Sequence, residues 1–248
     1  MELKNLIATS KTVDIYQKGS IAVKVFKEDS DKTMPLYEAL TQARVEATGL
    51  NVPKIHEVSV IDNRWAIHMD LIEGKTLANV MKEDPENIDK YIDDMLDIQL
   101  DIHSKQIPEL SKYKDVLKKQ INSLDEIDDG VKYELLTRLS SMPKHNKLCH
   151  GNFTPENIII NETGTYVVDW VAAGRGNASA DIGKTYLMLS LQMPEVAEKY
   201  LKLFCEKTNT SKKYVQEWLP IVAAARLIED KAEEKELLLK WVNVTSYE

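Results

Sequence analysis

Apolar and polar residues alternate along most of the first 70 positions, which is the pattern of half-buried β-strands. Four such runs form two pairs, and each pair meets at a turn sequence, Lys18-Gly19 in the first and Asp62-Asn63 in the second. Between the pairs, apolar residues recur at helical spacing, at Leu36, Leu40, Ala43 and Ala47. Gly49 follows, where a helix commonly ends. The N-terminal region is predicted to be a small sheet with one helix.

After a polar break at residues 72–76, the apolar period becomes that of amphipathic helices. One stripe runs through residues 85–107, and more helices are predicted for 114–127, 130–142 and most of 178–243. A short return to β pattern at 147–170 interrupts them. The chain is therefore predicted to have an α+β fold, with a β-rich region at 1–70 and a mostly helical region at 71–248.

The composition excludes several classes of protein. Apolar residues make up 43% and charged residues 29%, which suits one or two folded domains with a hydrated surface. No apolar run approaches the ~20 residues of a membrane span. The N-terminus lacks the apolar stretch of a secretory signal, so we expect a cytoplasmic protein without a membrane partner. Cys149 and Cys205 lie far apart and are expected to be packed, reduced thiols.

The net charge of −8 bears on the partners of the chain. It disfavours nucleic acid, because binding to phosphates needs a basic face. It permits a cationic substrate without requiring one, since many proteins are acidic for solubility alone.

Residues 148–170 carry the pattern with the most chemical content, HGNFTPENIII followed by TYVVDW. His150 and Asn157 bracket a polar, turn-rich loop between two apolar strands, and Asp169 ends the next strand. Amide and carboxylate oxygens on neighbouring strand ends can reach one ion from two sides, and such ligands suit Mg²⁺. Taken alone, Asn157 is better explained as a turn cap and Asp169 as a solvated strand end. Together they favour a magnesium site.

The spacing His150-Gly151-Asn152-x4-Asn157, followed by Val168-Asp169-Trp170, resembles the catalytic segment of the aminoglycoside phosphotransferase-like kinases. That family usually has His-Gly-Asp-x4-Asn, then Ile-Asp-Trp or Ile-Asp-Phe. The resemblance implies a protein-kinase-like fold with an N-lobe at 1–70 and a C-lobe at 71–248, which agrees with the periodicity along the whole chain. It also implies phosphoryl transfer from ATP or GTP, with Mg²⁺, to a hydroxyl group of a small molecule.

The same resemblance gives Lys24 a role. In IAVKVF it matches the strand lysine that holds the α- and β-phosphates, and it shares its strand face with Ala22 and Phe26. A glutamate on the following helix should pair with this lysine. Glu38 and Glu46 both qualify, and Glu38 is preferred from its position in the helix.

Further positions are implied to contact the nucleotide or to support the catalytic segment. They are Ser10, Lys11 and Thr12 in the phosphate-covering loop, Asp70 and Leu71 in the hinge that contacts adenine, and His103 and Asp181 beside the segment. The loop around Ser10 departs from the family ideal because it has no glycine.

Asn152 is the main departure, because the family has an aspartate that accepts or orients the proton of the acceptor hydroxyl. An amide is neutral and only a weak acceptor, and loss of general-base help typically costs about 10²–10⁴-fold in rate. Positioning and charge neutralisation supply most of the rate of phosphoryl transfer, so nucleotide binding should persist. Three explanations stay open: a nucleotide-binding pseudokinase acting through partner contacts, another group acting at the hydroxyl, or an engineered Asp-to-Asn change.

The acceptor is the least specified feature. Glu229, Asp230 and Glu233 are candidates to hold a cationic substrate, although a charge run of this kind is more often a solvated helix face. A choline-type substrate favours an aromatic cage, and the sequence shows no aromatic cluster. The prediction is therefore a small molecule with a hydroxyl group, and its identity stays open.

Overall fold

The structure, a computed structural model, describes residues 3–242. Contacts divide the chain into two compact units. The first runs to Val80 and includes Pro155–Val171, and the second holds Met81–Thr154 and the chain from Ala172 onward. The predicted lobes at 1–70 and 71–248 do not coincide with these units, because Pro155–Val171 hydrogen-bonds to residues before Val80.

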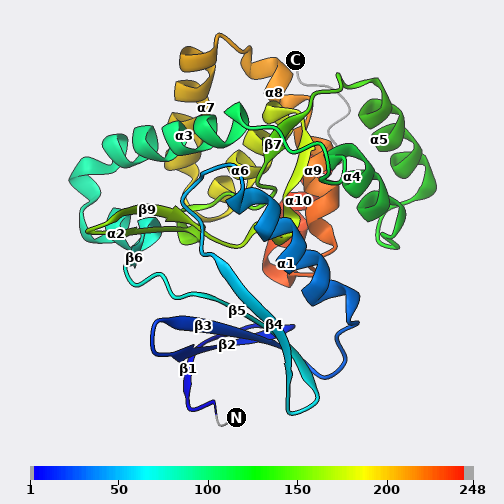
Figure 1. Cartoon of the computed structure of the whole chain (residues 1–248). Coiled ribbons are helices and arrows are strands. Elements are labelled where there is room, and N and C mark those ends of the chain that lie inside the picture. Colours follow the sequence, from blue (N-terminus) through cyan, green and yellow to red (C-terminus); the bar gives the residue numbers. More distant parts are fainter. Residues whose placement is uncertain (1–2, 243–248) are drawn as a thin grey trace. The chain divides into compact units, whose positions relative to one another are not determined.

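The first unit contains an antiparallel sheet in the order β1-β2-β3-β5-β4 (Figure 1). Its strands are β1 (Asn5–Thr9), β2 (Val13–Lys18), β3 (Ile21–Phe26), β4 (Ile55–Ile61) and β5 (Arg64–Asp70). The predicted turns are present. In the first turn Gly19 has φ 61°. In the second, Asp62 and Asn63 have φ 48° and 62°, so both central residues are left-handed, as one common type of two-residue hairpin turn requires.

Both faces of this sheet are apolar. Val23 and Val25 of β3 are fully buried on one face, with Ala66 of β5. On the other face, Phe26 and Ile67 pack against Ala39 of helix α1 (Thr33–Glu46). Strand β3 is thus buried on both sides, and the face with Phe26 is also the face that carries Lys24.

Helix α1 turns out to bury its polar residues. It encloses Glu38, Thr41 and Gln42, whereas Leu36 and Leu40 of the predicted apolar stripe are 45% and 50% exposed. The reason is that polar groups of the helix have partners on the inner side: Glu38 binds Lys24, and Gln42 donates to the carbonyl of Pro53 at 2.6 Å. The helical period was therefore a correct signal for the helix but not for its buried face.

The rest of the first unit is a three-stranded sheet in the order β6-β8-β9. Strand β6 (Lys75–Thr76) pairs with β8 (Ile158–Asn161), and β8 forms a hairpin with β9 (Gly164–Val167). The backbone N–H of Val167 also donates to the carbonyl of Asn51 at 3.0 Å. The pairing with β6 fixes the hairpin of residues 158–167 to the connector that follows β5, and the bond from Val167 fixes it to the segment between α1 and β4.

The second unit is helical apart from a small sheet of β7 (Lys147–Cys149) and β10 (Gly174–Gly176). The helices of this unit confirm the predicted α+β class. The division between the two units falls within α2 (Leu77–Glu83), and the other helices of the second unit follow it. They are α3 (Ile88–Ser104), α4 (Tyr113–Asn122), α5 (Asp129–Ser141), α6 (Ala178–Gln192), α7 (Pro194–Thr208), α8 (Lys212–Gln216), α9 (Leu219–Leu227) and α10 (Ala232–Val242). Asn243, the last residue of the predicted final helix, lies outside the described residues.

The remaining expectations on packing concern cysteines and membranes. Cys149 is buried and Cys205 half-buried, and both are free thiols. Within residues 3–242, no helix is long and apolar enough to cross a membrane.

Candidate functional site

Lys24 and Glu38 form a buried ion pair in the first unit. Lys24 Nζ lies 2.5 Å from Glu38 Oε1, and the two side chains are 13% and 7% exposed. Burial raises the pKa of Glu38 above its usual value; Lys24 opposes this effect, and the negative charge of Asp169 adds to it. Glu46, the alternative partner, instead accepts the backbone N–H of Ile55 at 2.7 Å. Of the two candidates, Glu38 is the one that contacts the lysine.

Asn157 and Asp169 lie at the open end of the β8–β9 hairpin, which belongs to the same unit. A 3₁₀ turn, η2 (Pro155–Asn157), leads into β8, and the N–H of Val168 donates to the carbonyl of Asn157 at 2.9 Å. Asp169 therefore comes directly after the residue that pairs with Asn157. Its charge also acts on Glu38, so the carboxylate and the ion pair share one electrostatic environment.

The backbone of Asp169 is in an uncommon conformation. Its φ of 65° lies in the left-handed region, which residues other than glycine seldom adopt and which is enriched at functional sites. Trp170 follows in a short turn, η3 (Trp170–Ala172), and its buried indole donates to the carbonyl of Val167 at 2.9 Å. This anchor holds the chain in a bend immediately after the strand.

An amide oxygen and a carboxylate at neighbouring strand ends suit magnesium, which is commonly held by one or two protein oxygens together with phosphates of a substrate. In the described part of the chain, no group of three or more His, Cys, Asp or Glu side chains has metal-binding geometry. Asn157 and Asp169 by their chemistry fit an ion that is shared with a phosphorylated ligand.

The predicted phosphate-covering loop is a closed turn between β1 and β2. The Ser10 hydroxyl accepts the N–H groups of Thr12 and Val13, at 3.3 and 3.2 Å, and the N–H of Ser10 donates to Val13 at 2.8 Å. Lys11 is exposed at the tip. Two of the backbone donors expected for phosphate, those of Ser10 and Thr12, are therefore already used inside the turn, and the Thr12 donor is used because Ser10 has a hydroxyl that glycine lacks.

The predicted hinge is similarly engaged. The N–H of Asp70 donates to Lys54 at 3.0 Å, and the N–H of Leu71 donates to Ser20 at 2.9 Å. The Asp70 carboxylate accepts the N–H of Lys54 at 3.1 Å and lies 2.7 Å from His56 Nε2. Adenine recognition by these two residues would rest on groups other than their N–H donors, and it stays a prediction.

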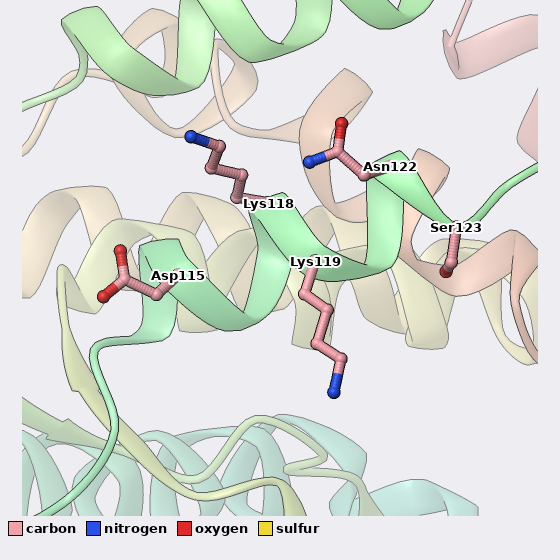
Figure 2. A pocket seen from close by; sticks show the side chains of 5 residues that line it. All are labelled: Asp115, Lys118, Lys119, Asn122 and Ser123. Atoms are coloured by element: carbon pink, nitrogen blue, oxygen red, sulfur yellow. The ribbon is translucent and has the colours of Figure 1, made fainter.

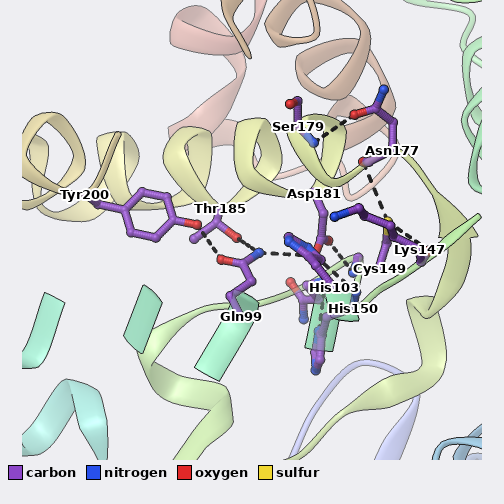
Figure 3. Close-up of polar contacts among 12 residues, drawn as sticks. Gln99, His103, Lys147, Cys149, His150, Asn177, Ser179, Asp181, Thr185 and Tyr200 are labelled. Carbon is purple, nitrogen blue, oxygen red and sulfur yellow. Dashed lines mark hydrogen bonds and ion pairs between the residues drawn. The ribbon is translucent and has the colours of Figure 1, made fainter. Parts of the chain in front are cut away.

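The His150–Asn152 segment belongs to the second unit and is held by a buried carboxylate (Figure 3). Asp181 accepts the N–H of Gly151 at 2.7 Å and of His150 at 3.2 Å, and it lies 2.9 Å from Nε2 of His103. Burial by itself would raise the pKa of Asp181, but the hydrogen bonds and positive charge around it lower that pKa to about 2. The carboxylate is therefore a permanent acceptor that fixes the segment.

Asn152 is partly exposed at the end of this segment, and its backbone N–H donates to Nδ1 of His150 at 3.1 Å. Gly151 before it has φ 78°, and a Cβ there would overlap the carbonyl of Ala172. The segment thus needs glycine for two reasons, backbone angle and space.

Sequence analysis missed part of this network. Gln99 donates to Asp181 at 3.1 Å and to Thr185 at 3.2 Å, and it accepts the hydroxyl of Tyr200 (Figure 3). Gln99 is fully buried. The available signal was a polar residue in phase with the apolar stripe of α3, four positions after Met95.

Two other surface features carry less chemistry. Glu229, Asp230 and Glu233 are all exposed, so they lie on a solvated surface as the simpler reading of the charge run suggested. A depression of about 470 Å³ on α4 is lined by Asp115, Lys118, Lys119, Asn122 and Ser123, which come from one helix and its end (Figure 2). It contains none of the predicted site residues.

Comparisons with known proteins point in the same direction as the motif. Residues 16–212 match the family model described as the phosphotransferase enzyme family. No curated protein sequence matches the chain significantly.

Solved structures show a kinase-like fold. A thermostable mutant of aminoglycoside phosphotransferase APH(4)-Ia, in ternary complex with AMP-PNP and hygromycin B, matches with TM-score 0.70 and 12% identity, over 97% of this chain and 91% of that one. Amicoumacin kinase hAmiN, in complex with AMP-PNP, Ca²⁺ and Ami, matches with TM-score 0.64 and 14% identity, over 96% of this chain and 86% of that one. A choline/ethanolamine kinase family protein from Mesorhizobium loti matches with TM-score 0.63 and 14% identity, over 100% of this chain and 83% of that one. At these identities the likeness concerns the fold alone.

Proposed function

This chain belongs to the phosphotransferase enzyme family, and on that premise we propose that it uses ATP and Mg²⁺ to phosphorylate a hydroxyl group of a small molecule. The observation that carries the proposal is the grouping of Lys24, Glu38, Asn157 and Asp169 in one compact unit, with Lys24 and Glu38 paired at 2.5 Å. AMP-PNP in two of the matched structures favours ATP over GTP as the donor.

The residues of the first unit would bind and orient the nucleotide. Lys24 supplies a positive charge for the phosphates, and Glu38 holds its ammonium group in place. Asn157 and Asp169 would hold Mg²⁺, which when bound supplies charge neutralisation at the phosphates. Since positioning and charge neutralisation dominate catalysis of phosphoryl transfer, these four side chains account for most of what the chain must provide.

Asn152 would face the acceptor hydroxyl and can orient it by hydrogen bonding, but it cannot take its proton near pH 7. The expected consequence is slow transfer, about 10²–10⁴-fold below an aspartate enzyme. A cationic acceptor is compatible with the net charge of −8, and the presence of hygromycin B and Ami in two matched structures favours a small-molecule acceptor.

Asn152 also favours a second candidate, a pseudokinase that binds nucleotide and acts through partner contacts. The two candidates differ in what Asn152→Asp should do. If the chain is a kinase, the aspartate variant should accelerate ATP consumption about 10²-fold or more with at least one hydroxyl compound in a broad panel. Asn152→Ala, which removes both the C=O and the NH₂ of the side-chain amide, is the matched control, and its ATP consumption should be slower than that of the parent.

Nucleotide binding is tested separately by thermal unfolding. At a ligand concentration 100 times Kd, binding should add about 2.7 kcal/mol, or roughly 5–10 °C for a chain of this length. No shift with saturating ATP and Mg²⁺ would reject both candidates. A shift combined with an inert Asn152→Asp variant would favour the pseudokinase.

A further inference from the structure

The Asn161 side chain joins two parts of the first unit that are far apart in sequence. Its Oδ1 accepts the N–H of Thr163 at 2.9 Å, the hydroxyl of Thr163 at 2.7 Å and the N–H of Gly164 at 3.2 Å. Its Nδ2 donates to the carbonyl of Glu73 at 2.8 Å. One end of the amide thus closes the β8–β9 turn, and the other end binds the connector after β5.

Gly74, next to Glu73, brings the same two parts together by contact. A Cβ on Gly74 would lie 2.5 Å from the carbonyl oxygen of Ile160 and 2.9 Å from Cγ2 of Ile159. Only glycine allows the connector backbone to approach β8 this closely. Immediately after it, Lys75 pairs with Ile160.

The geometry points to Asn161 and Gly74 as positioning residues that set the connector and the metal-binding end of the hairpin relative to each other. Asn161 is four residues from Asn157, or ~13 Å along the strand. Because β8 is short and Asn161 fixes its far end, a shift at the turn would tilt the end that carries Asn157 and Asp169. This inference rests on the proposed function, since it concerns a nucleotide that touches both the connector and the metal.

The consequence is a coupling between two halves of the ligand. Adenosine would use the connector alone, whereas ATP with Mg²⁺ spans the connector and the hairpin end. Loss of the contacts made by Asn161 and Gly74 should therefore weaken the binding of ATP with Mg²⁺ and leave the affinity for adenosine nearly unchanged. Loss of a group that orients metal ligands typically lowers metal affinity about 10–100-fold.

The test uses Asn161→Asp, which keeps the turn-closing oxygen and the shape of the side chain but places a carboxylate oxygen against the Glu73 carbonyl. Thr163→Ala is the matched control, because it removes a hydrogen bond of the same turn without touching the connector. Gly74→Ala is a second variant that separates the two parts by steric overlap. Calorimetric titrations of the full chain give Kd for adenosine and for ATP, the latter at a series of Mg²⁺ concentrations.

We expect Asn161→Asp and Gly74→Ala to raise the Mg²⁺ concentration needed for half-maximal ATP binding about tenfold, with adenosine affinity changed less than about twofold. Thr163→Ala should match the parent in both. An equal loss of affinity for both ligands, or no change in either affinity, overturns this inference alone. General destabilisation of the fold would weaken both ligands equally and would leave the ratio of their Kd values unchanged. A parent chain that binds neither ligand overturns the proposed function and this inference with it.

Discussion

Replacing Asp181 by asparagine tests the idea that a buried charge holds the His150–Asn152 segment. The carboxylate accepts four donors: two backbone N–H groups, the Nε2 donor of His103 and the amide of Gln99. An asparagine can turn its oxygen towards the three donors on the Oδ2 side, but its NH₂ group then meets the N–H of Gly151. Every hydrogen bond becomes a neutral one, and one buried N–H loses its acceptor.

The cost follows from these changes. A hydrogen bond to a charged group is worth about 1.5–3 kcal/mol and a neutral one about 0.5–1.5, and an unsatisfied buried N–H costs about 1–3 kcal/mol. Three bonds that each lose about 1–1.5 kcal/mol and one orphaned N–H together lower the expected free energy of unfolding of Asp181→Asn by roughly 4–7 kcal/mol. The pKa of Asp181 reports only the part due to the charge, since its shift from 3.8 to about 2 corresponds to ~2 kcal/mol.

The assay is urea unfolding of parent and variant between pH 5 and 8, with Ser190→Ala as the control on α6. Ser190 makes one local hydrogen bond to the carbonyl of Tyr186, so its loss should cost about 1 kcal/mol. The folded-state pKa of Asp181 is depressed, so its contribution is complete above pH 4 and is lost only as pH falls towards 2. A deficit below 1 kcal/mol throughout this pH range would refute the reasoning.

Two further predictions concern buried ion pairs. Lys24→Met should weaken ATP binding about 10–100-fold. Because burial raises the pKa of Glu38 and Lys24 no longer opposes this effect, the variant should also lose stability as pH rises from 5 to 8. Adding Glu38→Gln should remove that pH dependence, which urea unfolding can measure. Arg226→Met should cost up to about 3 kcal/mol, since it removes hydrogen bonds of 2.7 and 2.9 Å to Glu234 and leaves that carboxylate with Lys231, 3.5 Å away. The double variant with Glu234→Leu should recover much of the loss, and failure to do so would contradict this account.

Local sequence was sufficient for most of the elements and for their order, but it did not predict β1, β6, α2 or β10. Alternation predicted the other four strands of the large sheet, the left-handed residues at Gly19 and Asp62-Asn63 are present, and the helical periods predicted most of the helices. These features depend on neighbours within a few positions, which is the range over which periodicity and turn chemistry act. The motif from His150 to Trp170 likewise indicates the family by its residues and their spacing alone.

Distant contacts decided the rest. The apolar period of α1 could not say that Glu38 and Gln42 would lie inside, because their partners Lys24 and Pro53 are on other elements. Nor could it choose Glu38 over Glu46, which share a helix face. Gln99 and Asp181 are 82 positions apart, and nothing local to either one identifies the other.

The sequence by itself thus determined most of the strands and helices and the chemical types of the site residues, because each follows from side chains close together in the chain. Only the tertiary structure decided which of those residues meet. It paired Lys24 with Glu38, joined the hairpin of Asn157 and Asp169 to the connector through Asn161, and placed Asp181 under the segment of Asn152. Such pairings satisfy buried charges and backbone donors across the fold, and that requirement becomes visible only when the elements are packed.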